Sequence, residues 1–125
     1  MNDDITTQAV RLAMSMSQMR AEVAGVNIAQ ASSPGAQATR LDFGRSQGLL
    51  EQLVGRSPSS EAGLLSALSD AAFAPNPGQH KEASVGISLD EEVADMASAN
   101  LKYQALTESL NRHFGLMRLA ISGRN

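Results

Sequence analysis

The sequence predicts an all-α protein with long N- and C-terminal helices, packed as a coiled-coil-like pair or bundle, and an irregular, partly extended middle segment. Both ends of the 125-residue chain carry apolar residues at alternating steps of four and three, the spacing of a helix that packs along another helix. Between them, Ser, Gly and Pro interrupt regular structure. We divide the chain into an N-terminal helix over 1–30, a middle segment over 31–87 and a C-terminal helix over 88–125.

The first predicted helix carries an apolar ridge that repeats in heptads. Val10, Met14 and Ile28 widen it, which implies more than one neighbouring element. Gly25 costs about 1 kcal/mol relative to Ala inside a helix, and we interpret it as a close approach of two backbones. We predict that this N-terminal ridge packs against other subunits; it consists of Ile5, Ala9, Leu12, Met16, Met19, Val23 and Val26.

The middle segment opens with the turn cluster Ser32 to Gly35, which must end the first helix. If the residues after it are extended, Leu41 and Phe43 lie on the same side. A segment of this length with little core of its own is either functional or disordered when isolated. The expected elements are an extended stretch over 38–43, a helical turn or two over 49–54, one short helix near 61–73 and a second extended stretch over 80–87.

The last predicted helix begins at a capping box, in which Ser88 and Glu91 satisfy backbone donors of the first turn. Gly123 is the expected stop. Over 88–125 the helix would be roughly 50 Å long at about 1.5 Å per residue. We predict that its C-terminal ridge also packs against other subunits; it consists of Leu89, Val93, Met96, Asn100, Tyr103, Thr107, Leu110, Phe114, Met117 and Ile121.

Two members of the C-terminal ridge are polar, namely Asn100 and Thr107. One interpretation is that polarity is tolerated at an exposed edge of the ridge. The other is that these residues set register and partner choice, as a buried Asn does in coiled coils. The sequence leaves both interpretations open.

Composition narrows the possible functions. Cysteine is absent, so neither a disulfide nor a thiolate metal site holds the fold. The net charge of −3 is spread out, without the basic stripe that nucleic-acid binding needs. The acidic start MNDDITT is unlike a cleavable signal peptide, and no apolar run has the length of a membrane span. We therefore expect no nucleic-acid partner and, if the protein is exported, a route without signal cleavage.

The residues that could carry chemistry do not form a site in the sequence. His80 and His113 have no second ligand at helical spacing, so we interpret them as solvated or packing residues. The acidic residues between 90 and 95 are explained by the start of a helix, whose dipole favours negative charge. No nucleophile elbow or phosphate-binding loop is present in the sequence. We expect no enzymatic activity, no small-molecule substrate, no metal and no cofactor.

Two stretches carry a family resemblance. Residues 26–35 read VNIAQASSPG and residues 99–106 read ANLKYQAL; the second stretch continues as LMRLAI over 116–121. The first resembles the motif that closes the first helix of bacterial flagellar rod and hook axial proteins. The second is similar to the end of the small rod proteins of the flagellar basal body. The resemblance rests chiefly on Asn27, Ala29, Pro34, Gly35, Tyr103 and Gln104.

This resemblance implies a structural subunit of the proximal rod, the tubular drive shaft that links the membrane ring and export apparatus to the distal rod and transmits torque. The implied partners are copies of itself, other flagellar rod proteins, and membrane-ring and rod-adaptor proteins. The flagellar type III export apparatus would be a partner in transit. The implied location is the basal-body rod in the periplasmic space, reached without a cleaved signal peptide.

A second hypothesis is a helical chaperone or adaptor of a type III secretion system, expected to be a stable folded dimer in dilute solution. A rod subunit is instead expected to gain its helices on assembly, where neighbours supply the missing burial. A third, an interfacial amphipathic helix, is disfavoured by acidic helix starts without basic flanks. The rod hypothesis depends on two apolar ridges that only other subunits can cover.

Overall fold

The computed structural model describes residues 2–54, 61–73 and 76–123. The protein is mostly helical, with 75% helix, and the long N- and C-terminal helices are confirmed. Within the described ranges there are four helices and one two-stranded sheet, so the predicted all-α class needs the addition of that small sheet. The elements are α1 (Asn2–Gln30), β1 (Thr39–Asp42), α2 (Gly44–Val54), α3 (Glu61–Phe73), β2 (Gly78–Lys81) and α4 (Leu89–Ser122).

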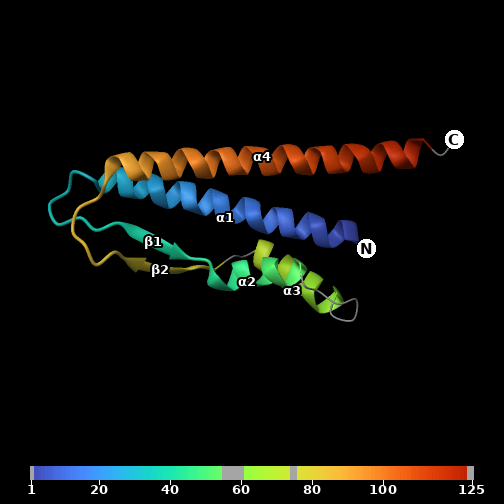
Figure 1. The fold of residues 1–125 in the computed structure, drawn as a ribbon, viewed down its shortest axis with the longest axis horizontal. Helices are drawn as coiled ribbons and strands as arrows, with labels where there is room; N and C mark the ends of the chain where they lie inside the picture. Colours follow the sequence, from blue (N-terminus) through green and yellow to red (C-terminus); the bar gives the residue numbers. More distant parts are fainter. Residues whose placement is uncertain (1, 55–60, 74–75, 124–125) are drawn as a thin grey trace.

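α1 is the central element of the fold. It lies between α4 on one side and β1, α2 and α3 on the other (Figure 1). α4 runs antiparallel to α1, and its last turns extend past the start of α1 (Figure 1). The two fully buried residues of α4, Glu92 and Ala99, both lie in its first third. The firm contact between the terminal helices is therefore near the end of α1 and the start of α4.

A turn ends α1, and a side-chain cap begins α4. After α1, a turn closes with a hydrogen bond from the Ser33 amide to the Gln30 carbonyl, and Gly35 adopts a positive φ of 72° that other residues rarely accept. Ser88 caps α4 by accepting a hydrogen bond from the Glu91 amide at 3.5 Å. The sequence therefore located both boundaries correctly.

The middle segment contains more regular structure than expected. β1 and β2 are antiparallel, and Arg40 lies opposite His80. α2 begins at Gly44, five residues before the predicted helical turn, because the Asp42 carboxylate accepts a hydrogen bond from the Gly44 amide at 2.9 Å. α3 spans the predicted residues. The helical turn or two expected over 49–54 lies within α2, which is longer than predicted.

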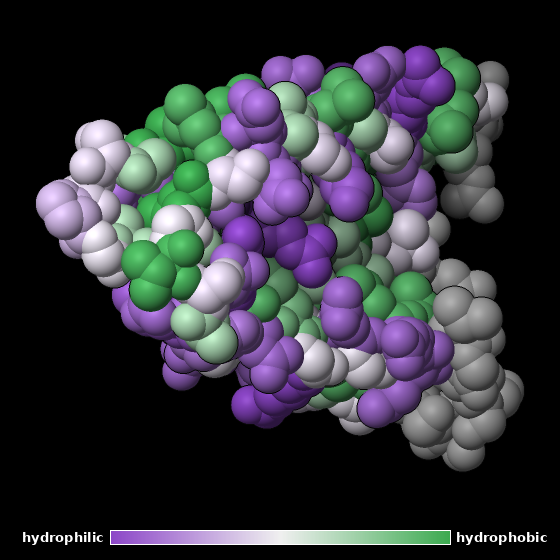
Figure 2. All heavy atoms as spheres, turned by 60° about the vertical axis from the view of Figure 1, so that its left-hand side comes forward, coloured by the Kyte–Doolittle hydropathy of each residue, from purple (hydrophilic) through white to green (hydrophobic). Residues whose placement is uncertain are grey.

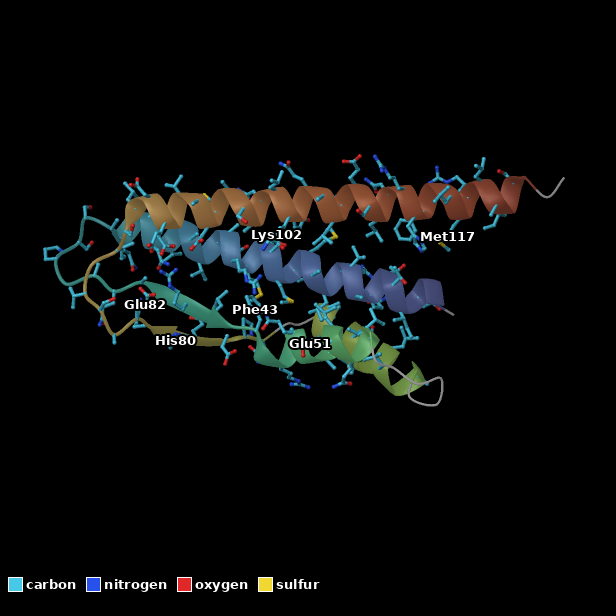
Figure 3. The ribbon with its side chains drawn as sticks, viewed as in Figure 1. Phe43, Glu51, His80, Glu82, Lys102 and Met117 are labelled. Atoms are coloured by element: carbon cyan, nitrogen blue, oxygen red, sulfur yellow. The ribbon has the colours of Figure 1, made fainter. Side chains whose placement is uncertain are left out.

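The N-terminal ridge is covered by the chain itself. The side chains of Ile5, Leu12 and Met16 are 1%, 0% and 5% exposed and form a core with Leu64 and Leu68 of α3. Phe43, which follows β1, completes this core below α1 (Figure 3). The expectation that only other subunits can cover this ridge is wrong for these three residues, because α3 and the residues around Phe43 supply the apolar partners.

The rest of the N-terminal ridge becomes more exposed toward the end of α1. Met19 packs against the core, Val23 is half-buried, and Val26 is 48% exposed. The guanidinium of Arg20 lies 4.9 Å from the centre of the Phe43 ring, a cation–π contact that closes this side of the core. Of the predicted subunit-packing residues on α1, Val26 is the one that the fold leaves most accessible.

The small core makes the stability of the fold sensitive to α3. Leu68 is fully buried, so Leu68→Ala removes apolar contacts and leaves a cavity; we expect a loss of about 2–5 kcal/mol in the free energy of unfolding. Urea denaturation followed by circular dichroism measures this loss. Leu101→Ala is the matched control, because Leu101 is 68% exposed and should change stability by about 0.5 kcal/mol or less. Equal effects of the two substitutions would contradict the described core.

Candidate functional site

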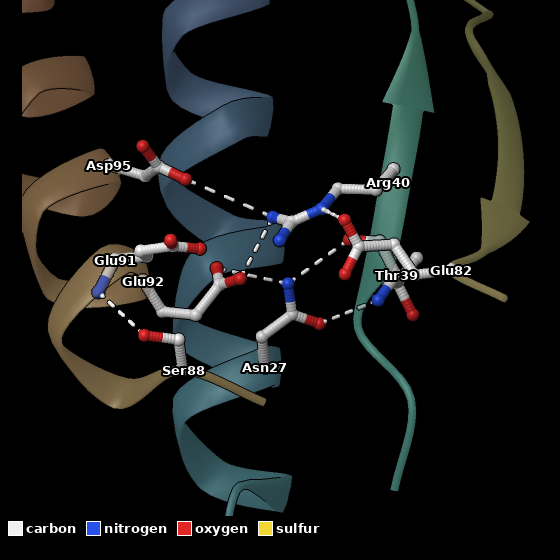
Figure 4. A network of polar contacts seen from close by, with 8 residues as sticks. All are labelled: Asn27, Thr39, Arg40, Glu82, Ser88, Glu91, Glu92 and Asp95. Atoms are coloured by element: carbon white, nitrogen blue, oxygen red, sulfur yellow. Dashed lines mark hydrogen bonds and ion pairs between the residues drawn. The ribbon is translucent and has the colours of Figure 1, made fainter. Parts of the chain in front are cut away.

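A buried polar cluster joins α1, β1 and α4. At its centre is Glu92, whose side chain is 1% exposed (Figure 4). One carboxylate oxygen lies 2.8 Å from Nη1 of Arg40, and the other accepts a hydrogen bond from Nδ2 of Asn27 at 3.1 Å. A buried carboxylate without such partners would be strongly destabilising. The Glu92 cluster, as we call it, comprises Asn27, Thr39, Arg40, Glu82, Glu92 and Asp95.

Asn27 connects the end of α1 to the strand. Its side-chain amide donates to the Thr39 carbonyl at 3.0 Å and accepts from the Thr39 amide at 2.8 Å. The side chain is fully buried and thus pairs with β1 much as the backbone of a neighbouring strand would. Asn27 carries the family resemblance in the sequence, and in the structure its contacts hold three elements of one chain together.

Arg40 is the cation of the Glu92 cluster. Its Nε atom donates to Glu82 at 3.0 Å, and its Nη1 atom lies 3.8 Å from Asp95 as well as contacting Glu92. The hydrogen bond to Glu82, with further attraction from Glu92, raises the pKa of Arg40 above its ordinary value despite partial burial. The guanidinium therefore stays charged at neutral pH, where it can pair with Glu92.

The Glu92 cluster sets which face of α4 meets α1. The buried and half-buried line on α4 includes Glu92, Ala99, Leu106 and His113, which repeat every seven residues. The sequence predicted the neighbouring series that contains Val93 instead. Because Glu92 and His113 are polar, the heptad pattern alone placed them outside the ridge. The face of α4 that meets α1 is thus shifted by about 50° from the predicted ridge, because one of the two predicted series is replaced by its neighbour and the series that contains Met96 is kept.

Part of the C-terminal ridge consequently lies at the edge of the contact with α1, and the rest lies outside it. Met96, Leu110 and Met117 are half-buried, and Met117 lies on the α1 side of α4 (Figure 3). The remaining apolar members are 37% to 73% exposed. Figure 2 shows apolar side chains interspersed among polar ones over the upper part of the molecule, where α4 lies. We call the accessible part the exposed stripe; it consists of Leu89, Val93, Asn100, Tyr103, Phe114 and Ile121.

Two grooves lie beside the middle of the exposed stripe, at Asn100 and Tyr103. One has a volume of about 410 Å³ and lies between Ala21 and Glu22 of α1 and Met96 of α4. The second reaches α3. Gln18 and Tyr103 line both grooves, so the two adjoin. Together the two grooves form one surface. On α4 it is lined by Met96, Asn100, Tyr103 and Leu110, and on α1 it is lined mostly by polar residues.

The two predicted ridges do not face each other. The N-terminal ridge is directed at α3 and Phe43, whereas α1 contacts α4 through other residues. Gly25 is one of them: a Cβ atom there would lie 3.1 Å from the terminal methyl group of Met96. The close approach predicted at Gly25 is therefore real, but its neighbour is a side chain of α4 and not a backbone.

The remaining resemblance residues are on the surface. Ala29 and Pro34 are exposed, and so are Tyr103 and Gln104 on α4. Gly35 supplies the positive φ of the turn. The structure gives these residues no common site, in contrast to Asn27.

Residues with catalytic or ligating potential are dispersed. His80 is exposed on β2, and the ring of His113 packs at a centroid distance of 6.2 Å from Phe114. In the described part of the chain, no three His, Asp or Glu side chains are placed to hold a metal ion. Across the same residues, no helix is long and apolar enough to cross a membrane. The exposed stripe is the most extensive candidate for a functional surface.

Comparisons of the chain with protein-family models, with characterised proteins and with solved structures find no match.

The structural role of the Glu92 cluster is testable by removing its cation. Arg40→Met leaves a buried carboxylate with one fewer partner, and we expect a loss of about 1–3 kcal/mol in the free energy of unfolding. In the double variant Arg40→Met/Glu92→Met, much of that loss should be recovered, as a double-mutant cycle measures. Arg112→Met is the control, since its ion pair with Glu108 is exposed and worth at most about 0.5 kcal/mol. Additive effects at Arg40 and Glu92 would show that the two groups are not coupled.

Proposed function

We propose that this protein is a structural subunit of the bacterial flagellar basal body, a proximal-rod protein of the FlgB type. In this role the terminal helices pack against neighbouring subunits in a tubular drive shaft that transmits torque. The observation that carries the proposal is the exposed stripe, which extends from Leu89 to Ile121 and whose apolar members remain 37% to 73% exposed. The resemblance of residues 26–35 and 99–106 to rod proteins supplies the biological setting.

An exposed apolar surface of this length is unusual on a monomer. Large apolar side chains scattered singly over a surface need no explanation, but several along one side of a helix, here interrupted by the polar Asn100, indicate an interaction site. Leu101, Leu116 and Leu119 lie toward the opposite side of α4 and are 68%, 66% and 66% exposed. A helix with apolar residues on several sides is typically buried among neighbours. α4 therefore has the surface of a helix that is enclosed in an assembly.

The Glu92 cluster also fits the role of a rod subunit. The Glu92 cluster holds α1, β1 and α4 together while the exposed stripe remains accessible. A subunit that is locked at one end presents α4 to its neighbours in a defined orientation. In a torque-bearing tube, stiffness would then come from many such helix contacts in parallel. The coiled-coil-like element would form between subunits, with α4 as its contribution.

The helical chaperone or adaptor of a type III secretion system is the second candidate. It is favoured by the self-covered core around Ile5, Leu12 and Met16, because a chain with its own core can fold before it meets a partner. The two candidates differ in where the protein is found. A rod subunit is retained in purified basal bodies, whereas a chaperone stays with unassembled substrates.

We expect a tagged copy of the protein to co-purify with flagellar basal bodies, and Phe114→Asp to abolish both its incorporation and motility. Phe114 is 42% exposed, so the added charge disturbs a subunit contact more than the fold. Circular dichroism verifies that the variant remains helical. Ser109→Asp is the comparison: Ser109 is exposed on α4 and belongs neither to the exposed stripe nor to the apolar residues on its other side, so this variant should be incorporated. Absence of the wild-type protein from basal bodies would overturn the proposed function.

A further inference from the structure

The exposed stripe is flanked by a row of residues that the fold also leaves uncovered. α1 covers the side of α4 that contains Glu92 and Ala99. On the other side of the stripe, one residue per heptad is exposed throughout: Asp90, Ala97, Gln104, Asn111 and Arg118. A helix that docks on the exposed stripe would therefore meet apolar residues at its centre and this exposed row along one edge.

The charges along α4 indicate which helix that is. The start of α4 is acidic, with Asp90 and Glu91 exposed, while Arg118 is exposed in its last third; Asp95 and Arg112 already form ion pairs with Arg40 and Glu108. Parallel pairing of two such helices in register places like charges side by side, which is unfavourable. Antiparallel pairing places each acidic start beside a basic end. The helix that complements α4 in both charge and spacing is a second α4.

We propose that the exposed stripe binds the α4 of a second copy of this chain in antiparallel orientation. With a two-fold axis at the level of Ala105, every position of the C-terminal ridge meets another ridge position. Leu89 then faces Ile121 of the second copy, and Met96 faces its Phe114. Directly opposite Asp90 is Ala120 of the second copy; Arg118, two residues away, is the residue of the exposed row nearest to Asp90 along this edge, and the two-fold axis generates this pair twice.

The grooves beside the exposed stripe fit this occupant. They place Gln18, Ala21 and Glu22 of α1 beside Met96 and Tyr103 of α4, so a docked helix would contact both helices. In an antiparallel pair the α1-covered edges of both α4 helices lie on the same side. The two α1 helices would then be neighbours as well, and the dimer would contain an antiparallel four-helix bundle.

This inference goes beyond the proposed function and can fail separately from it. The proposed function concerns assembly with flagellar components and is tested in basal bodies. The antiparallel dimer concerns the free protein and is tested in solution. A dimer of this kind would cover the exposed stripe until other subunits compete for it.

Charge reversal tests both the partner and its orientation. Asp90→Arg and Arg118→Asp each create two like-charge contacts in the antiparallel dimer, and each should weaken dimerisation about tenfold. In the double variant Asp90→Arg/Arg118→Asp, both contacts are attractive again, so the affinity should return. An equimolar mixture of the two single variants should likewise form heterodimers. Sedimentation velocity over a range of concentrations measures the dissociation constants, and circular dichroism verifies that each variant is helical.

A second pair of variants tests the apolar part of the proposed dimer contact. Phe114→Ser should abolish the dimer, whereas Leu101→Ser, on the other side of α4, should leave it unchanged. A protein that remains monomeric up to about millimolar concentration would overturn the proposal. So would a dimer whose double charge reversal fails to restore the affinity, because this would exclude the antiparallel contact between Asp90 and Arg118.

Discussion

Burial of the Glu92 carboxylate is the constraint on which the arrangement of this protein depends. A charged group enters the interior only where hydrogen bonds and an opposite charge replace water, and Arg40 and Asn27 provide both. Because these partners belong to β1 and α1, the ion pair fixes the rotation of α4 against the rest of the fold. Ala99, one heptad further along, then permits the two helices to approach closely. The exposed stripe faces outward as a consequence of this rotation.

The apolar residues of the two terminal helices differ in their surroundings. On α1 they form the core with α3, which allows the chain to hold its own shape. On α4 most of them stay accessible, and the Glu92 cluster keeps them in a fixed orientation. The core therefore depends on the apolar residues of α1, whereas those of α4 are largely exposed. The sequence-based expectation that both ridges lack cover within the chain holds only for part of α4.

The sequence predicted what depends on local patterns. The heptad spacing located both long helices, and the Ser88 cap and the turn at Gly35 located their facing ends. The rotation of α4 was not predictable in the same way, because a heptad pattern assigns polar residues to the outside. Glu92 is buried only because Arg40, fifty-two residues earlier, is brought to it by the fold.

An Asp two residues before a Gly could have indicated the start of α2 at Gly44, since Asp42 caps it. β2 is polar and exposed along its length and gives no strand-like alternation.

The rotation of α4 is open to direct measurement because the chain contains no cysteine. Single variants Ala99→Cys and Asn100→Cys introduce thiols at adjacent positions, and their rates of alkylation in dilute native protein report how accessible each position is. We expect slow alkylation at position 99, which packs against α1, and alkylation close to that of the unfolded chain at position 100. Protection of position 100 together with rapid alkylation of position 99 would contradict this expectation, and would show that the predicted heptad face, not the face that carries Glu92, meets α1.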